Sequence, residues 1–562
     1  MEATAVSRPA PSSPWWQTAL RRPVSAALIL LLIYVGLSFL NDTRGSLGTD
    51  TGGKVATLVT MTRNGDLDPD VGYWAAPYDP DGRVHGLYYT AKLGDRFLNV
   101  TSLPMVLAAQ PLYELGGYRL ALLLPMLGSI AAAFAGRAIA RRVGRKGGWA
   151  AFWVIGLASP LAIYALDFWE HSVGVALMAW GAVALYDAVH DRPNWWRGLA
   201  AGAAFGAAFS MRTEALAYGF AMVGVACLML LVARKNLAGA VLTGATAVVG
   251  LVTMLLANAT LEIGVLGSTF RSGRTSGAAS SGGGVLALRV KEALVTSFSP
   301  VPSVDAEAFV LGIGLTLALG YLVWCSWKRR ERTISIVVAG LVGFIYLYRF
   351  ASGLGFVPGL VATTPLAVAG VVLGWSRPRA RLFLAFALVP LPLVFFFQFP
   401  GGAAPQWAGR YILTTGTILA SVGVACLPRL EQWVRRFLLA LSVAVTVFGL
   451  AWLSVRSHDV ARAGDALEHR PEAVLISPDG FIPREFGATY GRKDWLASGN
   501  ATDLQFAAQV AADSGAPTMA VVALDRGSDP PSFPGWTEQG TERVPFITGT
   551  DFVVTTYVRT SP

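Results

Sequence analysis

The segment RRPVSAALILLLIYVGLSFL, residues 21–40, sets the first constraint on the fold. Two arginines precede an uncharged apolar run from Val24 to Leu40, close to the roughly 20 residues that a membrane-spanning helix needs. A secretory signal peptide would continue into a small-residue cleavage site, but the polar sequence NDTR follows instead. We therefore predict an uncleaved first helix, preceded by a disordered cytoplasmic tail at residues 1–20.

The rest of the chain shares the composition of this segment. Of its 562 residues, 54% are hydrophobic and 14% are charged, whereas soluble domains carry roughly a quarter of charged residues. The net charge of +10 could suit a nucleic-acid-binding protein, but the lysines and arginines cluster in short loops between apolar runs, as the positive-inside rule describes. The sequence therefore predicts a polytopic α-helical membrane protein in contact with lipid and with no nucleic-acid partner.

The basic clusters predict the topology. They lie at residues 141–146, 192–197, 234–235, 328–332, 377–381 and 429–436. Each interval between two clusters holds two apolar runs separated by a short break, so all clusters fall on one side of a membrane with about thirteen transmembrane helices. An odd number of helices in the plasma membrane places the N-terminus in the cytoplasm and the C-terminal segment outside the cell.

This topology divides the chain into a transmembrane module, residues 21–456, and an extracytoplasmic domain, residues 457–562. Within the module we expect a long first outer loop at 42–117 and a flexible outer loop, rich in Gly and Ser, at 261–305. The C-terminal domain shows, in order, a strand pattern at 473–476, an amphipathic helix at 503–513 and a strand pattern at 519–524. This order predicts a small α/β domain.

Ionisable residues at the outer ends of membrane helices are candidates for function, because charge within a membrane is costly. The sequence GTDTGGK, residues 48–54, follows the first helix closely. Asp50 and Lys54 lie one turn apart if a helix begins here, so an N-cap with a local ion pair is the simpler interpretation, and the local sequence favours it. The spacing of a Walker phosphate loop is absent.

A second outer turn, DFWEH at residues 167–171, holds two carboxylates and an imidazole. These groups could act as acid and base, as a metal pair, or as sugar ligands beside Trp169. The alternative is a solvated turn with an interfacial tryptophan. The other histidines, His85, His190, His458 and His469, have no partners at metal spacing, so we expect them at the surface.

Two further outer segments carry arginines. In MRTE, residues 211–214, Arg212 either pairs with Glu214 or binds a phosphate. In QWAGRY, residues 406–411, Arg410 enters a helix from the outside, against the positive-inside bias, which favours a role as an anion ligand. In the loop 261–305, Arg271 and Arg274 suit a lid over an anionic ligand, and a plain linker is the alternative.

The architecture of residues 20–456 resembles the GT-C glycosyltransferases. This superfamily includes protein O-mannosyltransferases, aminoarabinose transferases, oligosaccharyltransferases and mycobacterial arabinosyl- and mannosyltransferases. Asp50 matches the family's first-loop aspartate, Asp167 and Glu170 match the acidic position of its second outer loop, and the turns around Arg212 and Arg410 are similar to its Arg-x-Glu and late Arg-Tyr motifs. Asp50 is followed by Thr51 rather than by the second acid of the mannosyltransferases, which argues against mannose.

The resemblance implies an inverting transfer of a sugar from a polyprenyl-phosphate donor to a cell-envelope hydroxyl of a glycan, lipid or protein. Asp50 would be the general base, and Lys54, Arg212 and Arg410 would bind the donor phosphate. The residues implied in binding acceptor or sugar are Asp167, Trp169, Glu170, His171, Glu214, Trp407 and Tyr411. No cofactor is required; a divalent cation, if one is used, would sit on Asp167 and Glu170.

The abundance of Ala, Gly, Val and Arg resembles actinobacterial proteins, for which polyprenyl-phosphate arabinose or mannose would be the donor. The rival hypothesis is a transporter or flippase for a lipid-linked or anionic solute. A transporter would place paired charges near mid-membrane, between repeated halves, whereas here the charges gather at the outer helix ends. The glycosyltransferase hypothesis requires Asp50 and Arg410 to share one extracytoplasmic site.

Overall fold

The computed structural model of the chain describes residues 20–99, 102–144, 147–191, 194–269, 285–303, 305–353, 355–397, 406–527, 529–547 and 549–560. The predicted lid residues Arg271 and Arg274, and all but the last residue of the predicted N-terminal tail, lie outside these ranges.

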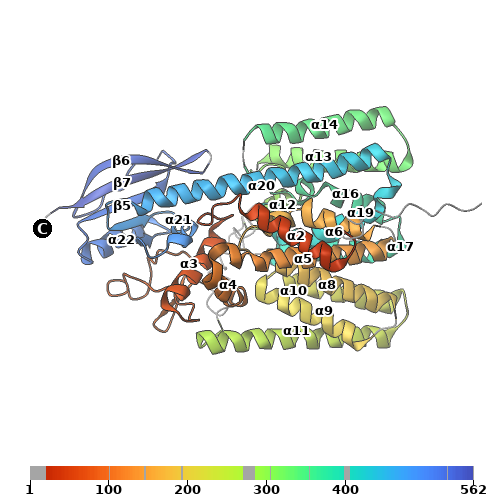
Figure 1. Ribbon diagram of the computed structural model, residues 1–562, viewed down its shortest axis with the longest axis horizontal. Coiled ribbons are helices and arrows are strands. Elements are labelled where there is room, and N and C mark those ends of the chain that lie inside the picture. Colours follow the sequence, from red (N-terminus) through yellow and green to blue (C-terminus); the bar gives the residue numbers. More distant parts are fainter. Residues whose placement is uncertain are drawn as a thin grey trace, which may run out of the picture.

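Long helices run side by side along the long axis of the molecule, and the C-terminal domain lies at one end of them (Figure 1). The helices of this bundle are α2 (Pro23–Ser38), α5 (Leu123–Val143), α6 (Gly148–Leu157), α8 (His171–His190), α9 (Trp195–Met211), α10 (Ala215–Val232), α11 (Leu237–Leu266), α13 (Ala306–Lys328), α14 (Arg332–Ala351), α16 (Pro365–Gly374), α17 (Pro378–Leu388), α18 (Pro390–Phe397), α19 (Leu413–Cys426) and α20 (Gln432–Glu468). Uncharged runs of this length form helices in lipid because every backbone amide must find its partner within the segment.

Within the described ranges, nine helical segments are long and apolar enough to cross a membrane, judged by length and composition. Three more apolar helices, α2, α6 and α16, are shorter. The number of about thirteen crossings therefore stays a prediction. The segment around α19 is 94% buried, whereas α11 and α14 are 22% buried, so α19 lies at the centre of the bundle and the other two at its periphery.

Glycines allow the central helices to approach closely. A Cβ atom added at Gly370 of α16 would lie 2.1 Å from the carbonyl oxygen of Leu419, and one at Gly423 of α19 would lie 2.2 Å from that of Leu366. Such small residues bring helix backbones into van der Waals contact, which is a common way for membrane helices to pack. They fix the position of α19, and with it the outer end that carries Arg410.

The first outer segment is structured rather than an extended loop. It contains α3 (Thr49–Asn64), the hairpin of β1 (Ala91–Leu93) and β2 (Arg96–Leu98), and α4 (Leu103–Ala121). The helix α4 kinks at Gly116–Gly117, where Gly117 adopts a φ of +64° that favours glycine.

The prediction of a flexible loop across 261–305 is wrong for its described ends. The helix α11 extends to Leu266, and α12 (Val285–Phe298) forms within the predicted loop. Gly312 of α13 explains the position of α12, since an added Cβ there would lie 2.9 Å from the backbone of Phe298. Close packing on α13 stabilises this helix although its sequence is flanked by Gly and Ser.

The C-terminal domain is a five-stranded sheet with the strand order β4-β3-β5-β7-β6. Its elements are β3 (Val474–Ser477), α21 (Ile482–Glu485), β4 (Asp494–Ala497), α22 (Ala501–Asp513), β5 (Thr518–Leu524), β6 (Trp536–Ile547) and β7 (Thr550–Arg559). β3 pairs in parallel with β4 and β5, whereas β7 pairs antiparallel with β5 and β6. The predicted strand, helix and strand coincide with β3, α22 and β5, while β4, β6 and β7 were not predicted. The domain begins after Glu468 rather than at residue 457, because α20 continues beyond the bundle.

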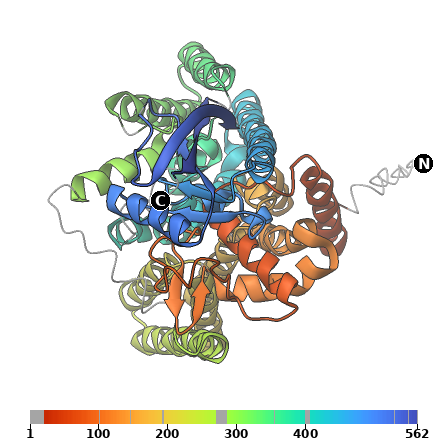
Figure 2. The same ribbon diagram turned by 90° about the vertical axis from the view of Figure 1, so that its left-hand side faces the viewer.

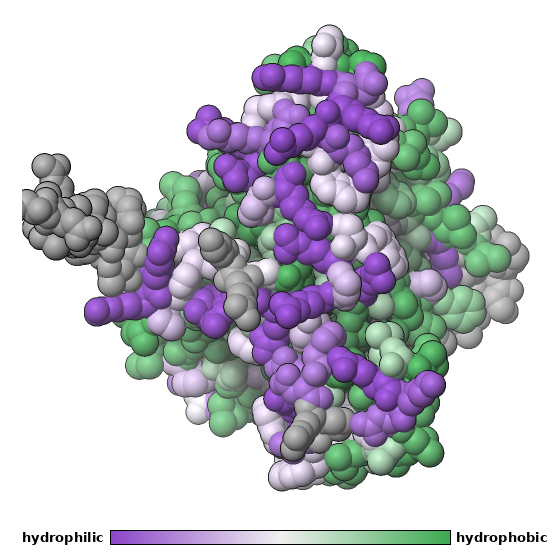
Figure 3. Space-filling view, turned by 90° about the vertical axis from the view of Figure 1, so that its right-hand side faces the viewer, coloured by the Kyte–Doolittle hydropathy of each residue, from purple (hydrophilic) through white to green (hydrophobic). Residues whose placement is uncertain are grey.

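The first outer segment and the C-terminal domain form one body (Figure 2). His85 pairs with Leu496 of β4 in an antiparallel bridge, and the amide of Ala497 donates to the carbonyl of Val84 at 3.0 Å. The prediction that His85 lies at the surface is wrong, because it is 5% exposed and stacks on Phe97. Burial lowers its pKa to about 4. At the opposite end of the bundle, hydrophilic residues gather between apolar flanks (Figure 3).

Candidate active site

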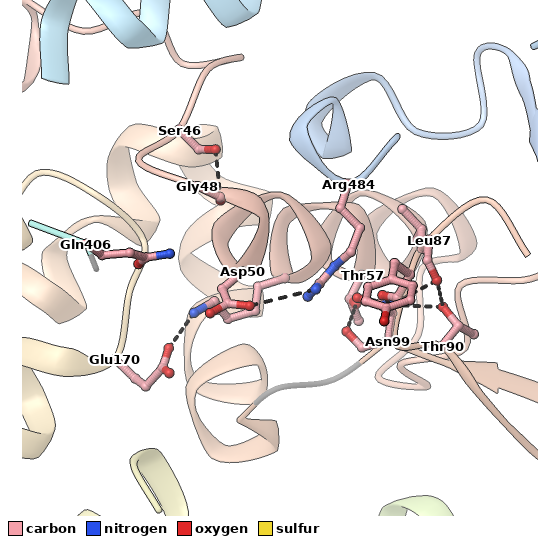
Figure 4. Close-up of polar contacts among 12 residues, drawn as sticks. Ser46, Gly48, Asp50, Thr57, Leu87, Thr90, Asn99, Glu170, Gln406 and Arg484 are labelled. Carbon is pink, nitrogen blue, oxygen red and sulfur yellow. Dashed lines mark hydrogen bonds and ion pairs between the residues drawn. The ribbon is translucent and has the colours of Figure 1, made fainter. Parts of the chain in front are cut away.

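The helix α3 presents the first part of the site. Its N-cap is Gly48, with extended backbone angles of φ 177° and ψ 176°, and no side chain caps the helix. The expected local arrangement, with Asp50 or Thr51 as the cap and an Asp50–Lys54 ion pair, is therefore wrong. Asp50 pairs instead with Arg410 and faces Arg484, as Figure 4 shows for Arg484, and Lys54 pairs with Glu170.

Asp50 lies between two arginines. Its Oδ2 atom accepts a hydrogen bond from Nη1 of Arg410 at 3.1 Å, and its Oδ1 atom lies 3.7 Å from Nη1 of Arg484. The Asp50 side chain is 28% exposed, whereas those of Arg410 and Arg484 are 8% and 1% exposed. The carboxylate is thus the one open member of a buried ion-pair cluster. The two residues that the sequence hypothesis required to meet do so.

The electrostatic environment of Asp50 is cationic. Burial acts to raise the pKa of its carboxyl group, but the positive charges of Arg410, Arg484, Lys54 and Arg212, in that order, hold this pKa below its ordinary value. Asp50 is consequently ionised at neutral pH. The same four cations make this location favourable for a second anion.

Glu170 connects the remaining cations. Nζ of Lys54 donates a hydrogen bond to Oε2 of Glu170, and Nη1 of Arg212 donates to Oε1 at 3.1 Å. Nε of Arg212 also donates a hydrogen bond to Glu214 at 3.0 Å. The predicted Arg212–Glu214 pair therefore exists together with the Arg212–Glu170 pair. Burial acts to raise the pKa of Glu170, but Lys54 and Arg212 lower it overall. Lys54 is fully buried.

Asp167 has neutral partners. It accepts hydrogen bonds from the amide of Leu47 at 2.9 Å, from the hydroxyl of Tyr118 at 3.1 Å and from the hydroxyl of Thr51. Burial raises its pKa despite these bonds. Asp167 therefore ties the second outer turn to the first outer segment, and its predicted contact with sugar or acceptor stays a prediction.

The carboxylates do not form a metal site in the part of the chain that is described. No group of three or more His, Cys, Asp or Glu residues there is arranged to hold a metal ion. Asp167 is held by neutral donors and Glu170 by two cations, so neither offers a hard cation the anionic, unengaged oxygens that it prefers.

Aromatic rings border the arginines. The ring of Trp169 stacks on His171 at a centroid distance of 4.6 Å, and the guanidinium of Arg410 lies 5.6 Å from the Trp169 ring. Tyr411 lies beneath both arginines, 4.6 Å from Arg410 and 5.0 Å from Arg212, and its hydroxyl accepts from Nη2 of Arg410 at 2.7 Å. These contacts hold the guanidinium groups in fixed orientations.

Two predicted ligands are enclosed. Trp407 stacks on Trp452 at 5.6 Å and is 1% exposed, so it belongs to the apolar core rather than to a sugar-binding surface. His171 is also 1% exposed, and its ring nitrogens have no hydrogen-bond partner among the described residues. It contributes its ring to the stack with Trp169 and Tyr164.

The sequence did not indicate Arg484 or Tyr89. Arg484 lies in the C-terminal domain between Pro483 and Glu485, where an arginine looks like an ordinary surface residue. Its guanidinium lies 5.5 Å from the ring of Tyr89. No local pattern could have identified it, because its function depends on a contact with α3 more than 400 residues earlier in the chain.

An apolar cavity of about 520 Å³ lies next to the segment that follows Arg410. Its lining comes from α12, α13, α16 and α19, from the short helix α15 (Leu360–Thr363), and from Leu388 of α17 and Leu391 of α18. It also includes Ile412, two residues after Arg410. Leu317 and Trp324 on its rim are 68% and 40% exposed, so the cavity opens on the side of the bundle. An elongated hydrocarbon chain fits such a space.

No family model and no curated protein sequence matches the chain. Among solved structures, it is similar to ArnT from Cupriavidus metallidurans bound to undecaprenyl phosphate, with 13% identity, a TM-score of 0.48, and coverage of 97% of this chain and 98% of that one. It is also similar to the Archaeoglobus fulgidus oligosaccharyltransferase in complex with zinc and sulfate, with 12% identity, a TM-score of 0.44, and coverage of 88% and 67%.

A third similar structure is the oligosaccharyltransferase AglB of the same archaeon in complex with an inhibitory peptide and a dolichol phosphate. Its identity is 11%, its TM-score is 0.45, and the coverage is 90% of this chain and 70% of that one. Oligosaccharyltransferases are among the enzymes of the GT-C resemblance described above. With identities of 11–13% and TM-scores of 0.44–0.48, these similarities leave the function to be argued from the site itself.

Proposed function

We propose that this protein is an inverting membrane glycosyltransferase of the GT-C type. It moves a sugar from a polyprenyl-phosphate donor to a hydroxyl group of a cell-envelope glycan, lipid or protein. The observation that carries this proposal is the 3.1 Å contact between Asp50 and Arg410 at the end of an apolar helical bundle. This contact places a partly exposed carboxylate beside a set of buried cations.

The cations suit the donor's phosphate. Arg410, Arg484, Lys54 and Arg212 each influence Asp50 electrostatically, so they surround one small volume. A phosphodiester that loses its sugar gains negative charge on the departing oxygen, and prearranged cations stabilise that charge in a water-poor site. Arginine is especially suited, because its planar guanidinium matches two phosphate oxygens at once.

The lateral apolar cavity suits the donor's lipid. It is lined by Ile412, two residues after Arg410, and by Thr415 and Leu419 of α19, so a chain within it would continue from a phosphate held at the arginines. Its lining is dominated by aliphatic and aromatic residues, among them Leu360, Val368 and Leu391. Close van der Waals packing against these side chains would keep the lipid chain in place while its head group reacts.

The chemistry follows from these positions. The acceptor hydroxyl attacks the anomeric carbon from the face opposite the phosphate, and Asp50 takes the hydroxyl proton. A new bond forms between the acceptor oxygen and the anomeric carbon as the bond from that carbon to the phosphate oxygen breaks, so the configuration inverts. The leaving group, polyprenyl phosphate, departs as an anion and needs no acid. No divalent cation is required for this step.

The reaction is assigned to the outer face of the plasma membrane. The helix α3, which carries Asp50, lies with the C-terminal domain at one end of the bundle (Figure 1). The positive-inside rule assigns the basic clusters of the sequence to the other side. The N-terminus is accordingly cytoplasmic.

The test uses the full chain in lipid nanodiscs with a panel of radiolabelled polyprenyl-phosphate sugars, including arabinose and mannose, and cell-envelope acceptors. We expect one donor to lose its label to an acceptor, without sensitivity to EDTA. Label in the product with the anomeric configuration inverted would support the proposal. Transfer from no donor, or lipid movement that needs no acceptor hydroxyl, would overturn it.

A further inference from the structure

A turn of the C-terminal domain lies directly against the first turn of α3. The positions where these segments touch are glycines: a Cβ atom at Gly52 would lie 1.5 Å from the carbonyl oxygen of Arg484, and one at Gly487 would lie 1.8 Å from that of Gly52. A Cβ at Gly53 would lie 2.6 Å from Nη2 of Arg484. Only glycine permits such backbone contact, so the two segments are matched to each other.

This contact directs the Arg484 side chain into the site (Figure 4). Its neighbour Glu485 accepts a hydrogen bond from Nη2 of Arg456 at 2.7 Å, and Nε of Arg456 donates to the carbonyl of Ser46 at 3.1 Å. The turn is thus fixed to α20 and to the first outer segment at once. With 1% exposure, the Arg484 guanidinium faces Asp50 and cannot reach solvent unless the turn moves away.

A buried guanidinium is stable only when an anion is near it. Here the anion is a carboxylate at 3.7 Å that is itself shared with Arg410. Two arginines from different domains therefore converge on one partly exposed carboxylate, at the location to which the proposed function assigns the donor phosphate. A phosphodiester offers these groups two anionic oxygens, as Asp50 does, and a phosphate monoester offers three.

We propose that Arg484, supplied by the C-terminal domain, is an anion ligand of the site that holds Asp50 before the donor binds and contacts the donor phosphate afterwards. This inference rests on the proposed function, because it takes the phosphate to be that of the lipid donor. It makes the C-terminal domain a part of the active site rather than an appendage.

The transfer of Arg484 from Asp50 to the donor phosphate changes the basicity of Asp50. The charged or titratable groups around it come from six segments. These are Lys54 on α3, Tyr89 in the first outer segment, Glu170 in the turn before α8, Arg212 in the turn after α9, Arg410 and Tyr411 in the turn before α19, and Arg484 on α21. A phosphate that attracts the two arginines weakens their hold on Asp50. Donor binding then makes Asp50 a stronger base at the moment when the acceptor must lose its proton.

The experiment compares two lipids that differ only in the anion. Binding of undecaprenyl phosphate and of neutral undecaprenol is measured for the full-length protein and for Arg484→Gln, Arg484→Lys and Arg543→Gln. Arg543 is a matched control from the same domain, 71% exposed and paired with Asp525 away from the site. We expect Arg484→Gln to weaken undecaprenyl phosphate binding by roughly tenfold or more and to leave undecaprenol binding unchanged. Arg543→Gln should bind both lipids like the wild type.

Arg484→Lys keeps the charge but loses the two-pronged donor, so it should restore only part of the affinity. The melting temperature of each variant is recorded. If Arg484→Gln does not fold, Arg484→Lys decides: a loss of about threefold or more for the phosphate lipid alone supports the assignment. The assignment would be overturned if the Arg484 variants bound undecaprenyl phosphate as tightly as the wild type, or if they lost equal affinity for both lipids. Arg484 would then be a purely structural residue.

The pH dependence provides a second readout once a donor is known. The acidic limb of the pH profile of kcat/KM reports the pKa of Asp50 in the free enzyme, and the acidic limb of kcat reports it in the donor complex. Because the bound phosphate raises this pKa, we expect the limb of kcat at higher pH than that of kcat/KM. Arg484→Gln should shift the acidic limb of kcat/KM to higher pH, because it removes one of the cations that lower the pKa of Asp50. Coincident limbs in the wild type would contradict the exchange. Failure of the proposed function looks different, because the wild-type protein would then bind both lipids equally.

Discussion

Asp50 and Asp167 belong to the same group of outer segments, yet their surroundings differ in kind. Asp50 is 28% exposed and faces the guanidinium groups of Arg410 and Arg484. Asp167 is 1% exposed and is held by two hydroxyls and one backbone amide. The pKa of Asp50 is lowered by its cations, whereas burial raises that of Asp167.

The type of partner separates a carboxylate suited to chemistry from one suited to structure. Cations around a partly open carboxylate can accept a different anion, so the arrangement can change when a substrate arrives. Neutral donors around an enclosed carboxylate have no such alternative and fix the geometry of the chain. The sequence assigned a chemical role to both residues, and on these surroundings we propose that role for Asp50 alone.

The largest effect that tests this difference is on catalysis. Asp50→Asn keeps the shape of the side chain but cannot accept a proton, so we expect kcat for sugar transfer to fall by roughly 10³-fold. The melting temperature should fall as well, because the buried guanidinium groups of Arg410 and Arg484 lose the anion that they face. The assay is transfer from the labelled donor to its acceptor, and an Asp50→Asn protein with wild-type turnover would remove Asp50 from the role of base.

The next effect is on stability. Asp167→Ala leaves the amide of Leu47 and the hydroxyls of Tyr118 and Thr51 without their acceptor, which should cost about 3 kcal/mol. Asp167→Asn retains the shape and one acceptor oxygen and should cost less. Thermal denaturation in detergent measures both. If Asp167→Ala lost activity at an unchanged melting temperature, Asp167 would belong with Asp50 instead.

A smaller effect concerns the contact between the domains on the Asp50 side. Gly52→Ala inserts a methyl group 1.5 Å from the Arg484 carbonyl, so the turn must move, at an expected cost of roughly 2 kcal/mol. Transfer activity should fall with it. Gly340→Ala is the matched control, because nothing lies within 4 Å of its Cβ position on α14. Equal behaviour of the two variants would show that the close contact does not matter.

The smallest effect is the pH dependence of stability, and its sign differs between the two carboxylates. The lowered pKa of Asp50 gives stability that is present above its ordinary value and is lost as the pH falls. The raised pKa of Asp167 does the opposite, because its protonated form is favoured in the folded protein. On acidification, Asp50→Asn should lose less stability than the wild type and Asp167→Asn more. Melting temperatures across the acidic range measure this, and slopes of the same sign would contradict the assignment.

Much of the fold was readable from the sequence. The apolar runs coincide with helices, since a chain segment without charges in lipid has to satisfy its own backbone. The runs at 473–476, 503–513 and 519–524 coincide with β3, α22 and β5, because period and composition are local properties. Segments whose conformation depends on packing were not predicted: α12 forms against α13, and β6 pairs with β7 although it alternates little.

Local composition alone predicts an apolar helical bundle with ionisable residues at the ends of its helices, because charge is expelled from hydrocarbon wherever the neighbours lie. Which of these residues meet depends on how the helices and domains pack. Asp50 pairs with Arg410, 360 residues away, and with Arg484 of another domain rather than with Lys54 one turn along its helix. The physical reason is that an ion pair forms at about 3 Å, and such distances are set by helix packing and domain contact, not by local spacing.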